Sequence, residues 1–222
     1  MITRLHEPYL ALLRQAMLAA TPPGSRVALD VGCGDGSKTR WLRACSASDA
    51  LIVGVDRDGS VLRAADDIMF IVGDATHLPL RDACIDLVWC IAALNLFPHR
   101  HLALREMWRV LCHGGTLVIA SAGEYWVRLR NHPAPLIAAL PDTPLPLPPA
   151  DGLDEEWSLL MAAAGFRPHR TQAYLLNGGR LAQVALIDSE ALTSHLSLSP
   201  CASPVADPEP HHLLVVTSGW KV

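Results

Sequence analysis

The chain has 222 residues, half of them hydrophobic, a length that fits one domain of ordinary size with a full core. It carries 18 Lys and Arg against 22 Asp and Glu, a formal net charge of −4 at pH 7. No basic run is present, which argues against a nucleic-acid groove and favours a small neutral or cationic substrate.

The cysteines and histidines show no metal-ligand spacing, so no metal site is predicted. Six cysteines without a CxxC pair predict free thiols in a reducing compartment. The longest apolar blocks, around Ala50–Val55 and Cys84–Leu96, fall short of the roughly 18 to 20 residues that span a bilayer. Residues 1–7 lack the apolar core of a secretory signal. We therefore expect no membrane span and a cytoplasmic location.

The first predicted element is an amphipathic helix over Glu7–Ala20, which Thr21–Gly24 ends. A short apolar strand, Val27–Val31, follows and runs into a glycine-rich loop. Ser37 is predicted to cap a helix that continues through Leu42 and beyond.

Four more short apolar strands alternate with helical or loop segments. Helices are predicted over Val61–Ala65 and about His101–Leu111, and Gly114–Gly115 is expected to end the second. This alternation predicts an α/β fold, a doubly wound and mostly parallel sheet with helices on both faces. The four strands are predicted at Leu51–Val55, Ile68–Val72, Ile85–Cys90 and Thr116–Ala120.

The pattern changes after the fifth strand. Residues 131–149 hold seven prolines, so a loop is predicted, either a lid over a substrate or a solvated insertion. A helix over Asp154–Ala164 and closing strands at Arg167–Leu176 and His212–Thr217 are expected, with a mobile Ser/Pro-rich segment, Leu192–Pro210, between the strands. We expect a single domain over 1–222, made of an N-terminal helix (1–24), a core (25–121), a Pro-rich insertion (122–153) and a C-terminal helix with closing strands (154–222).

The loop Gly32-Cys33-Gly34-Asp35-Gly36 stands between a predicted strand and a predicted helix. Glycines let the backbone approach a bulky ligand, and a helix N-terminus directs free N–H groups toward it. A tight structural turn is the alternative interpretation. By itself the loop indicates a nucleotide-like ligand without specifying which one.

Carboxylates stand at the ends of three predicted strands. Asp56 ends the second strand, where a carboxylate can accept hydrogen bonds from both hydroxyls of a ribose. Asp74 ends the third strand, and Asp30 lies inside the first. A buried Asp30 needs a partner, either loop amides or the ammonium group of a ligand. Together the three predict a site for adenosine carrying a positive tail.

These residues resemble class I S-adenosylmethionine-dependent methyltransferases of the small-molecule type. The resemblance implies a Rossmann-like sheet of seven strands whose last strand is antiparallel. The chain departs from many relatives at Asn95, where they have a histidine, and at His113, where they have proline. The similarity spans 25–121 through Val27–Gly36, Gly54–Asp56, Gly73–Ala75, Ile85–Val88 and Arg105–Gly115.

The resemblance also implies S-adenosylmethionine as cofactor, with S-adenosylhomocysteine as product. Asp30 and the glycine loop would lie beside its methionine part, Asp56 would bind its ribose, and Asp74 with Ala75 would bind its adenine. Cys90 would border the site of methyl transfer. The implied cofactor-binding set is Asp30, Gly32, Cys33, Gly34, Gly36, Asp56, Arg57, Gly73, Asp74, Ala75 and Cys90.

Neither the catalytic base nor the acceptor atom is determined by the sequence, and the oligomeric state is also open. A base is needed only if the acceptor must lose its proton early. For each histidine, a surface or packing role is the alternative. Tyr125 and Trp126 are candidates for an apolar acceptor pocket or for core packing. The candidate bases are Asn95, His99, His6 and Tyr9, with Glu124 as a further pocket residue.

Substrate and function classes are narrowed by residues that the chain lacks. Enzymes that methylate amino groups of nucleic acids carry Asn/Asp-Pro-Pro-aromatic after the fourth strand, where this chain has Cys90–Ala93. A small-molecule acceptor is therefore expected. An NAD-dependent oxidoreductase would show GxGxxG and a Tyr-x-x-x-Lys pair, yet the chain has only Lys38 and Lys221 as lysines. A non-catalytic methyltransferase-like protein that serves a partner is the second alternative.

Overall fold

The computed structural model describes residues 7–129, 159–176, 196–200 and 211–222. The chain forms two units with dense internal contacts, and the expected single domain stays a prediction. The larger unit comprises Arg14–Ser121, Ser158–Arg170 and Val216–Val222, and the smaller one Met1–Leu13, Ala122–Trp157 and Thr171–Val215.

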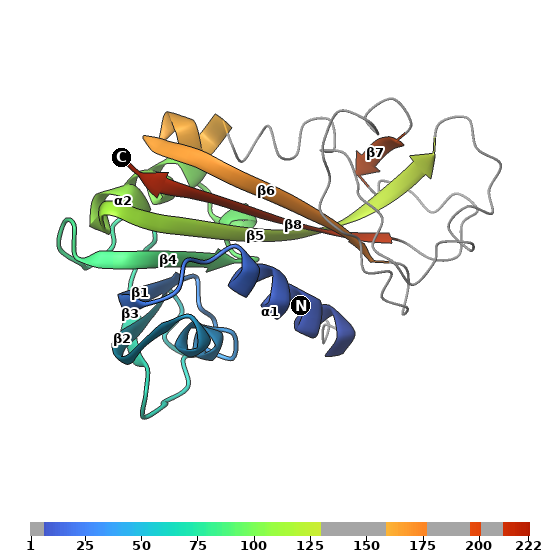
Figure 1. The fold of residues 1–222 in the computed structure, drawn as a ribbon. Coiled ribbons are helices and arrows are strands. Elements are labelled where there is room, and N and C mark those ends of the chain that lie inside the picture. The colour runs from blue at the N-terminus through green and yellow to red at the C-terminus, as the bar shows by residue number, and fades with distance from the viewer. Residues whose placement is uncertain (1–6, 130–158, 177–195, 201–210) are drawn as a thin grey trace. The chain divides into compact units, whose positions relative to one another are not determined.

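The first five described strands follow one another along the chain in the predicted order (Figure 1). The helices are α1 (Glu7–Ala19), the 3-10 helix η1 (Thr39–Ala44), the 3-10 helix η2 (Leu94–Leu96) and α2 (Arg100–Val110). The strands are β1 (Ser25–Val31), β2 (Ser46–Asp56), β3 (Met69–Val72), β4 (Ile85–Ile91), β5 (Leu111–Leu129), β6 (Phe166–Leu176), β7 (Leu196–Pro200) and β8 (His211–Lys221).

The strands form a sheet in the order β3-β2-β1-β4-β5-β8-β6. The pairs β1 with β2, β1 with β4, β2 with β3 and β4 with β5 are all parallel. The arrow of β8 runs against that of β5 (Figure 1), which matches the antiparallel last strand of the prediction. The α/β class with seven strands along this path is confirmed. An unpredicted strand, β7, pairs antiparallel with the far end of β5 inside the smaller unit.

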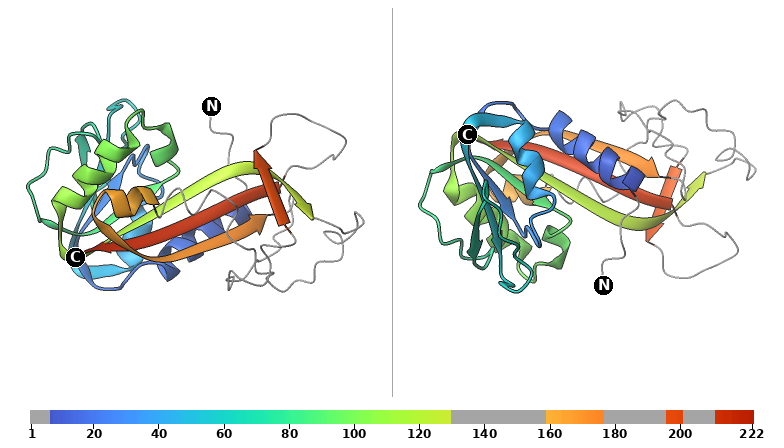
Figure 2. Two further views of the ribbon diagram at one scale, coloured as in Figure 1. Left: turned by 90° about the horizontal axis from the view of Figure 1, so that it is seen from above. Right: turned by 90° about the horizontal axis from the view of Figure 1, so that it is seen from below.

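The core of the larger unit lies along its parallel strands. The last four residues of β1 and most of β4 are buried on both faces, as strands covered on two sides are. Both views in Figure 2 show α2 alongside these strands. Trp89 is fully buried, and its indole N–H donates to Thr21 Oγ1 at 3.0 Å, which in turn donates to the carbonyl of Met17 at 2.6 Å. This chain of bonds satisfies the buried indole N–H at the end of α1.

Two predicted helices of the core are wrong. The helix capped by Ser37 is only the short 3-10 helix η1, and its N-cap is Lys38 without a side-chain bond. The amide of Ser37 instead donates to Asp35 Oδ1, so a turn occupies the first residues of the predicted helix. Val61–Ala65 is also not helical. There Asp58 accepts bonds from the amide and hydroxyl of Ser60, which favours a turn over a helix.

The end of α2 and the elements that follow it also differ from the prediction. Gly114–Gly115 does not end α2, because Leu111 is already extended and both glycines lie within β5. The Ser/Pro-rich Leu192–Pro210 contains β7. Of the helix predicted at Asp154–Ala164, residues 159–163 are described and helical, whereas 131–149 lie outside the described residues.

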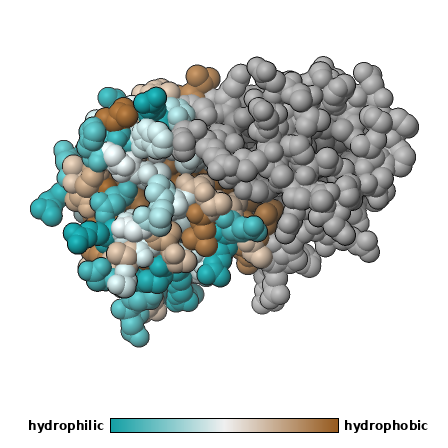
Figure 3. Space-filling view, viewed as in Figure 1, coloured by the Kyte–Doolittle hydropathy of each residue, from teal (hydrophilic) through white to brown (hydrophobic). Residues whose placement is uncertain are grey.

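The outer surface of the larger unit is mixed in hydropathy. Figure 3 shows hydrophilic residues spread over the visible face of the described part, with apolar residues between them. No helix within the described ranges is long and apolar enough to cross a membrane.

Candidate functional site

The glycine loop follows β1 and bends through backbone that favours glycine. Gly32, Gly34 and Gly36 have φ values of +75°, +56° and +76°. The amides of Gly32 and Cys33 both donate to the carbonyl of Val55, at 2.8 and 3.1 Å, and this ties the loop to the end of β2. The sequence therefore encodes a loop whose shape only glycines adopt at low cost.

The loop is packed at its ends and open in its middle. A Cβ added to Gly32 would lie 2.4 Å from the Cβ of Ala93, and one added to Gly36 would lie 2.3 Å from the ring of Phe70. A Cβ added to Gly34 would meet nothing within 4 Å. Gly34 is thus the point at which a bound molecule can approach the loop backbone.

Asp56 lies beside this opening. Its Oδ2 accepts the amide of Gly34 at 2.8 Å, and its Oδ1 accepts the amide of Asp58 at 3.0 Å. Each carboxylate oxygen offers about two acceptor positions, so the half-buried side chain can still accept bonds from ligand hydroxyls. The loop and the carboxylate are therefore positioned by each other.

Asp30 is the buried carboxylate of the site. Its Cα partners in the sheet are Gly54 and Trp89, and the residue is 2% exposed. Oδ2 accepts the hydroxyl of Thr39 at 2.6 Å, whereas Oδ1 has no partner among the described residues. Burial raises the pKa of Asp30 from 3.8 to about 6, while the Thr39 bond and the charge of Lys38 lower it. An unsatisfied buried carboxylate oxygen is costly, and this one is available to a donor from a ligand.

Asp74 follows β3 and is exposed. Its Oδ1 accepts both the amide and the hydroxyl of Thr76 at 2.8 Å, and these bonds lower its pKa. The amide of Gly73 donates to the carbonyl of Asp56 at 3.0 Å, and Ala75 is buried next to this turn. The exposed Arg57 lowers the pKa of Asp74 through its charge. The structure thus brings the predicted ribose and adenine residues together.

Two predicted thiols belong to the interior. Cys90 is fully buried in β4, and burial together with the charge of Asp30 raises its pKa. Burial raises the pKa of Cys33 to about 12. Both thiols are therefore in the neutral form near pH 7. That Cys90 borders the reacting methyl group stays a prediction.

The segment after β4 touches the glycine loop. Ala92 has a φ of +53° and donates its amide to the carbonyl of Ala120 at 2.7 Å. The ring of Phe97 would lie 3.2 Å from a Cβ on Gly32. Asn95 is exposed, and Leu96 is 69% exposed. A non-glycine residue held in left-handed backbone is strained, and such strain collects at functional sites.

The candidate bases are only partly described. His99 is exposed at the N-cap of α2, and its ring lies edge-on to that of His101 with centroids 6.4 Å apart. His6 lies outside the described residues, as do the side chains of Tyr9, Glu124, Tyr125 and Trp126. No arrangement of described residues identifies a base. In the described ranges, no three His, Cys, Asp or Glu side chains are grouped as metal ligands.

Sequence reasoning missed three contributors to the site. Thr39 bonds Asp30, Phe97 contacts the loop at Gly32, and Phe70 fills the space left by Gly36 and Gly54. No local pattern marks Thr39, because its partner is nine residues away and the segment was expected to be an α-helix. Phe70 lies within β3 and Phe97 directly after η2, both among apolar residues, so neither differs in the sequence from a core residue.

The donor set fits a molecule that combines a cationic group with a diol. An open glycine backbone, a buried carboxylate with an oxygen that no described residue bonds and a second carboxylate at the next strand end match what a nucleoside needs at the strand ends of a doubly wound sheet. The residues fit S-adenosylmethionine, because Asp30 can accept a hydrogen bond from its ammonium group and Asp56 can accept hydrogen bonds from its ribose hydroxyls.

Comparison with known proteins identifies the class. The family model described as "Methyltransferase domain" matches residues 29–119. A demethylmenaquinone methyltransferase from Roseiflexus sp. is 30% identical over 172 residues, which cover 66% of this chain and 70% of the relative. The chain therefore belongs to the class I S-adenosylmethionine-dependent methyltransferase family.

Other similarities are shorter or concern the fold alone. Methyltransferase GfsG from Streptomyces halstedii is 36% identical over 102 residues, and the match covers 41% of this chain and 36% of that protein. The first curated relatives are thus matched over much less than two thirds of their length. A solved methyltransferase structure from Bacillus halodurans has a TM-score of 0.63 at 16% identity, covering 95% of this chain and 99% of the other.

Proposed function

We propose that the chain binds S-adenosylmethionine at the glycine loop and transfers its methyl group to a small-molecule acceptor. The observation that carries this proposal is Oδ1 of Asp30, a buried carboxylate oxygen without a partner among the described residues. It is complementary to the cationic amino group of the cofactor, and the open backbone at Gly34 lies on the loop that directly follows β1.

Three parts of the site hold three parts of the cofactor in this proposal. Asp30 accepts a bond from the amino group, and Gly34 allows the backbone to approach the molecule. Asp56 accepts bonds from the ribose hydroxyls through the acceptor positions that the amides of Gly34 and Asp58 leave open. Asp74 and Ala75 border the adenine. Arg57, Gly73 and Cys90 complete the proposed set.

When bound, the cofactor supplies a methyl group that is already electrophilic because it is attached to a sulfonium. The remaining contribution of the protein is to orient the acceptor in line with this methyl group and to exclude water, which together can supply much of the rate. The acceptor is then held near the segment after β4, where Phe97 contacts the loop at Gly32. No proton transfer is assigned to any residue.

A small-molecule acceptor is supported by charge and by similarity. The net charge of −4 does not favour a polynucleotide. A relative that covers two thirds of this chain is named for demethylmenaquinone, which is a small molecule. Leu96, largely exposed after β4, offers an apolar contact at that end of the strand.

Calorimetric titration with S-adenosylhomocysteine tests the cofactor part of the proposal. We expect binding to the wild type and its loss in Asp56→Ala. The matched control is Asp58→Ala, which removes an exposed carboxylate from the same turn, one that bonds Ser60, and should leave Kd unchanged. NADH should give no heat. Absence of binding to the wild type would contradict the proposal.

A radiolabelled methyl-transfer assay against a panel of quinols, phenols, amines and carboxylic acids tests turnover. Labelling of one class that disappears in Asp56→Ala supports the transferase. Tight binding of S-adenosylhomocysteine without labelling of any acceptor would favour the alternative, a non-catalytic protein that uses the cofactor to serve a partner.

A further inference from the structure

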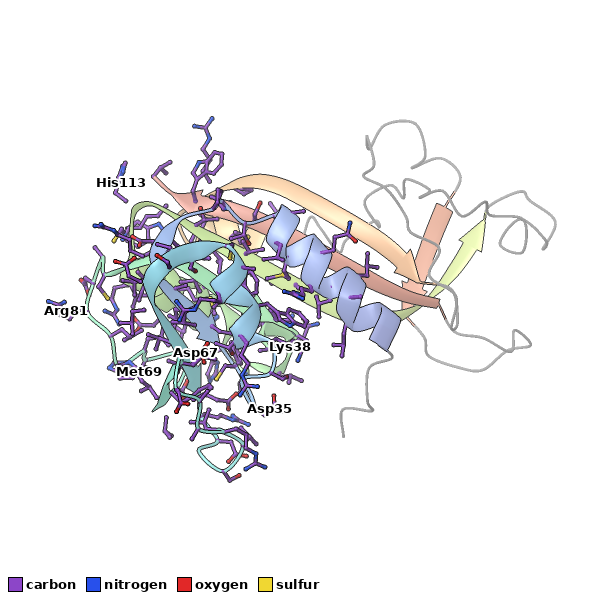
Figure 4. All side chains as sticks on the ribbon, turned by 60° about the horizontal axis from the view of Figure 1, so that its bottom comes forward. Asp35, Lys38, Asp67, Met69, Arg81 and His113 are labelled. Atoms are coloured by element: carbon purple, nitrogen blue, oxygen red, sulfur yellow. The ribbon has the colours of Figure 1, made fainter. Side chains whose placement is uncertain are left out.

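Thr39 is fully buried at the start of η1 and donates its hydroxyl to Oδ2 of Asp30 at 2.6 Å. The position of η1 is set by the turn before it, in which the amide of Ser37 donates to Oδ1 of Asp35. Figure 4 shows Asp35, where this turn begins, close to Lys38, which follows it, on the larger unit. The hydroxyl of Thr39 is therefore held at the Asp30 carboxylate by the same loop that forms the cofactor site.

This bond makes the two oxygens of Asp30 unequal. Among the described residues, Thr39 is the donor to Oδ2 and nothing donates to Oδ1. A carboxylate with 2% exposure is poorly stabilised by water, so each missing bond is costly. The arrangement leaves one defined oxygen available to a ligand.

We propose that Thr39 is a positioning residue for the cofactor, which by occupying Oδ2 of Asp30 reserves Oδ1 for the cofactor's ammonium group. The inference rests on the proposed function and extends it to a residue outside the glycine loop and the strand ends. Thr39 itself does not touch the cofactor.

A pH dependence of binding follows from this role. Burial raises the pKa of Asp30 to about 6, and the Thr39 bond opposes that rise. Only the ionised carboxylate attracts the ammonium group, so binding weakens as the pH falls through about 6. The Cys33 and Cys90 thiols stay neutral in this range, because burial raises the pKa of each. The other ionisable groups whose charges act on Asp30 are Lys38, which lowers its pKa, and Asp56, which raises it.

The experiment measures Kd by calorimetry between pH 5 and pH 7.5 with two ligands. One is S-adenosylhomocysteine, and the other is 5′-methylthioadenosine, which has the same nucleoside and thioether but no amino-acid tail. The proteins are the wild type, Thr39→Val and Thr39→Ser. Valine has the shape of threonine without the hydroxyl, and serine keeps the hydroxyl.

For the wild type we expect the affinity for S-adenosylhomocysteine to fall about tenfold from pH 7 to pH 5, and the affinity for 5′-methylthioadenosine to stay constant. Thr39→Val loses a hydrogen bond to the carboxylate, so the pH at which its affinity for S-adenosylhomocysteine falls should be about one to two units higher than in the wild type. Thr39→Ser should show the wild-type pH dependence. At pH 7, Thr39→Val should then bind S-adenosylhomocysteine about two- to tenfold more weakly.

Three results would overturn the inference. Equal weakening of both ligands by Thr39→Val would indicate a structural role, and a pH-independent wild-type Kd for S-adenosylhomocysteine would remove the role of Asp30 ionisation. Either leaves the proposed function standing. If the wild type binds neither ligand at any pH, the proposed function itself fails. Should Thr39→Val not fold, Thr39→Ala, which also lacks the hydroxyl, replaces it in the same measurements with the same expected results.

Discussion

The parallel sheet of the larger unit carries carboxylates at both edges, the amino edge where its strands begin and the carboxyl edge where they end. At the amino edge Asp86 accepts the amides of Arg26 and Val27 at 2.8 and 2.9 Å. At the carboxyl edge Asp30 is more deeply buried, yet one of its oxygens has no partner in the described part of the chain. Figure 4 shows the labelled Arg81 and His113 apart from Asp35 of the glycine loop and Lys38 at the start of η1.

Glu106, on α2, is like Asp86 a carboxylate that bonds other groups of the protein. It accepts the amide of Leu78 at 2.8 Å and pairs with Arg109, which also bonds the carbonyls of Leu78 and Leu80 and the carboxylate of Asp82. The pairing lowers the pKa of Glu106 and raises that of Arg109. Both the amino-edge and the carboxyl-edge carboxylates belong to segments that resemble the family. Similarity to the family therefore does not distinguish Asp30 from the amino-edge carboxylates, whereas the buried oxygen of Asp30 that no described residue bonds does.

The largest expected effect comes from Asp30→Asn. Replacing the buried carboxylate by a neutral amide should weaken S-adenosylhomocysteine binding at least about 100-fold, because the ammonium group loses the buried counter-charge that Asp30 offers in the proposed site. Calorimetry at pH 7.5 measures this. Asp86→Asn is the matched control at the amino edge and should leave Kd unchanged. A similar loss in both variants would break the comparison.

Glu106→Ala should lower the free energy of unfolding by about 2 to 3 kcal/mol, because the amide of Leu78 and the guanidinium of Arg109 both lose a charged partner. Urea denaturation measures the loss. The Kd for S-adenosylhomocysteine should not change. Asp82→Ala, which removes a partner that is 78% exposed, should have little effect on stability. Weakened binding in Glu106→Ala would show that the two edges are coupled.

The pH dependence of stability should show the cost of burying Asp30. The folded-state pKa of about 6 is higher than the ordinary value of 3.8, so the folded state holds this proton more tightly. The stability that this provides is complete below about pH 3.8 and is lost as the pH rises through 6. Between pH 4 and pH 7 the wild type should lose about 2 kcal/mol relative to Asp30→Asn. Parallel urea-unfolding profiles for the two proteins would contradict the assignment.

Gly34→Ala should weaken S-adenosylhomocysteine binding about tenfold, because a methyl group at the open point of the loop would meet the bound molecule. Gly114→Ala is the control at the opposite edge. Gly114 also has a positive φ, +78°, and free space around an added Cβ, so both variants carry the same kind of backbone strain. Thermal unfolding should shift alike in both, and only Gly34→Ala should change Kd.

The order of the first five strands was predictable because each contains a short apolar run bounded by its own turn residues. The resemblance over 25–121 identified the strand ends, and the structure places Asp30, Asp56 and Asp74 after or within three neighbouring strands as expected. Strand lengths were less predictable. β2 begins five residues earlier than its apolar run, and β5 extends through Gly114–Gly115, because pairing with neighbouring strands decides where extended backbone continues.

Two of the predicted helices are absent because short turns form where the spacing of apolar residues favoured a helix. The Asp35 turn displaced the predicted start at Ser37, and the Asp58 turn replaced a helix near Val61. In both, a short carboxylate side chain accepts nearby amides and competes with helical backbone. The expected single domain, the cytoplasmic location and the roles of individual cofactor residues stay predictions.

The sequence by itself determined the class of fold, the glycine loop and the three carboxylates, because apolar runs and glycine spacing are local properties of the chain. Only the tertiary structure decided which carboxylate oxygens are used. Oδ2 of Asp30 is bonded by Thr39 and Oδ1 is not, while Asp86 and Glu106 bond backbone amides of other segments. A hydrogen bond depends on positions in space that distant residues bring together, and no spacing along the chain encodes that placement.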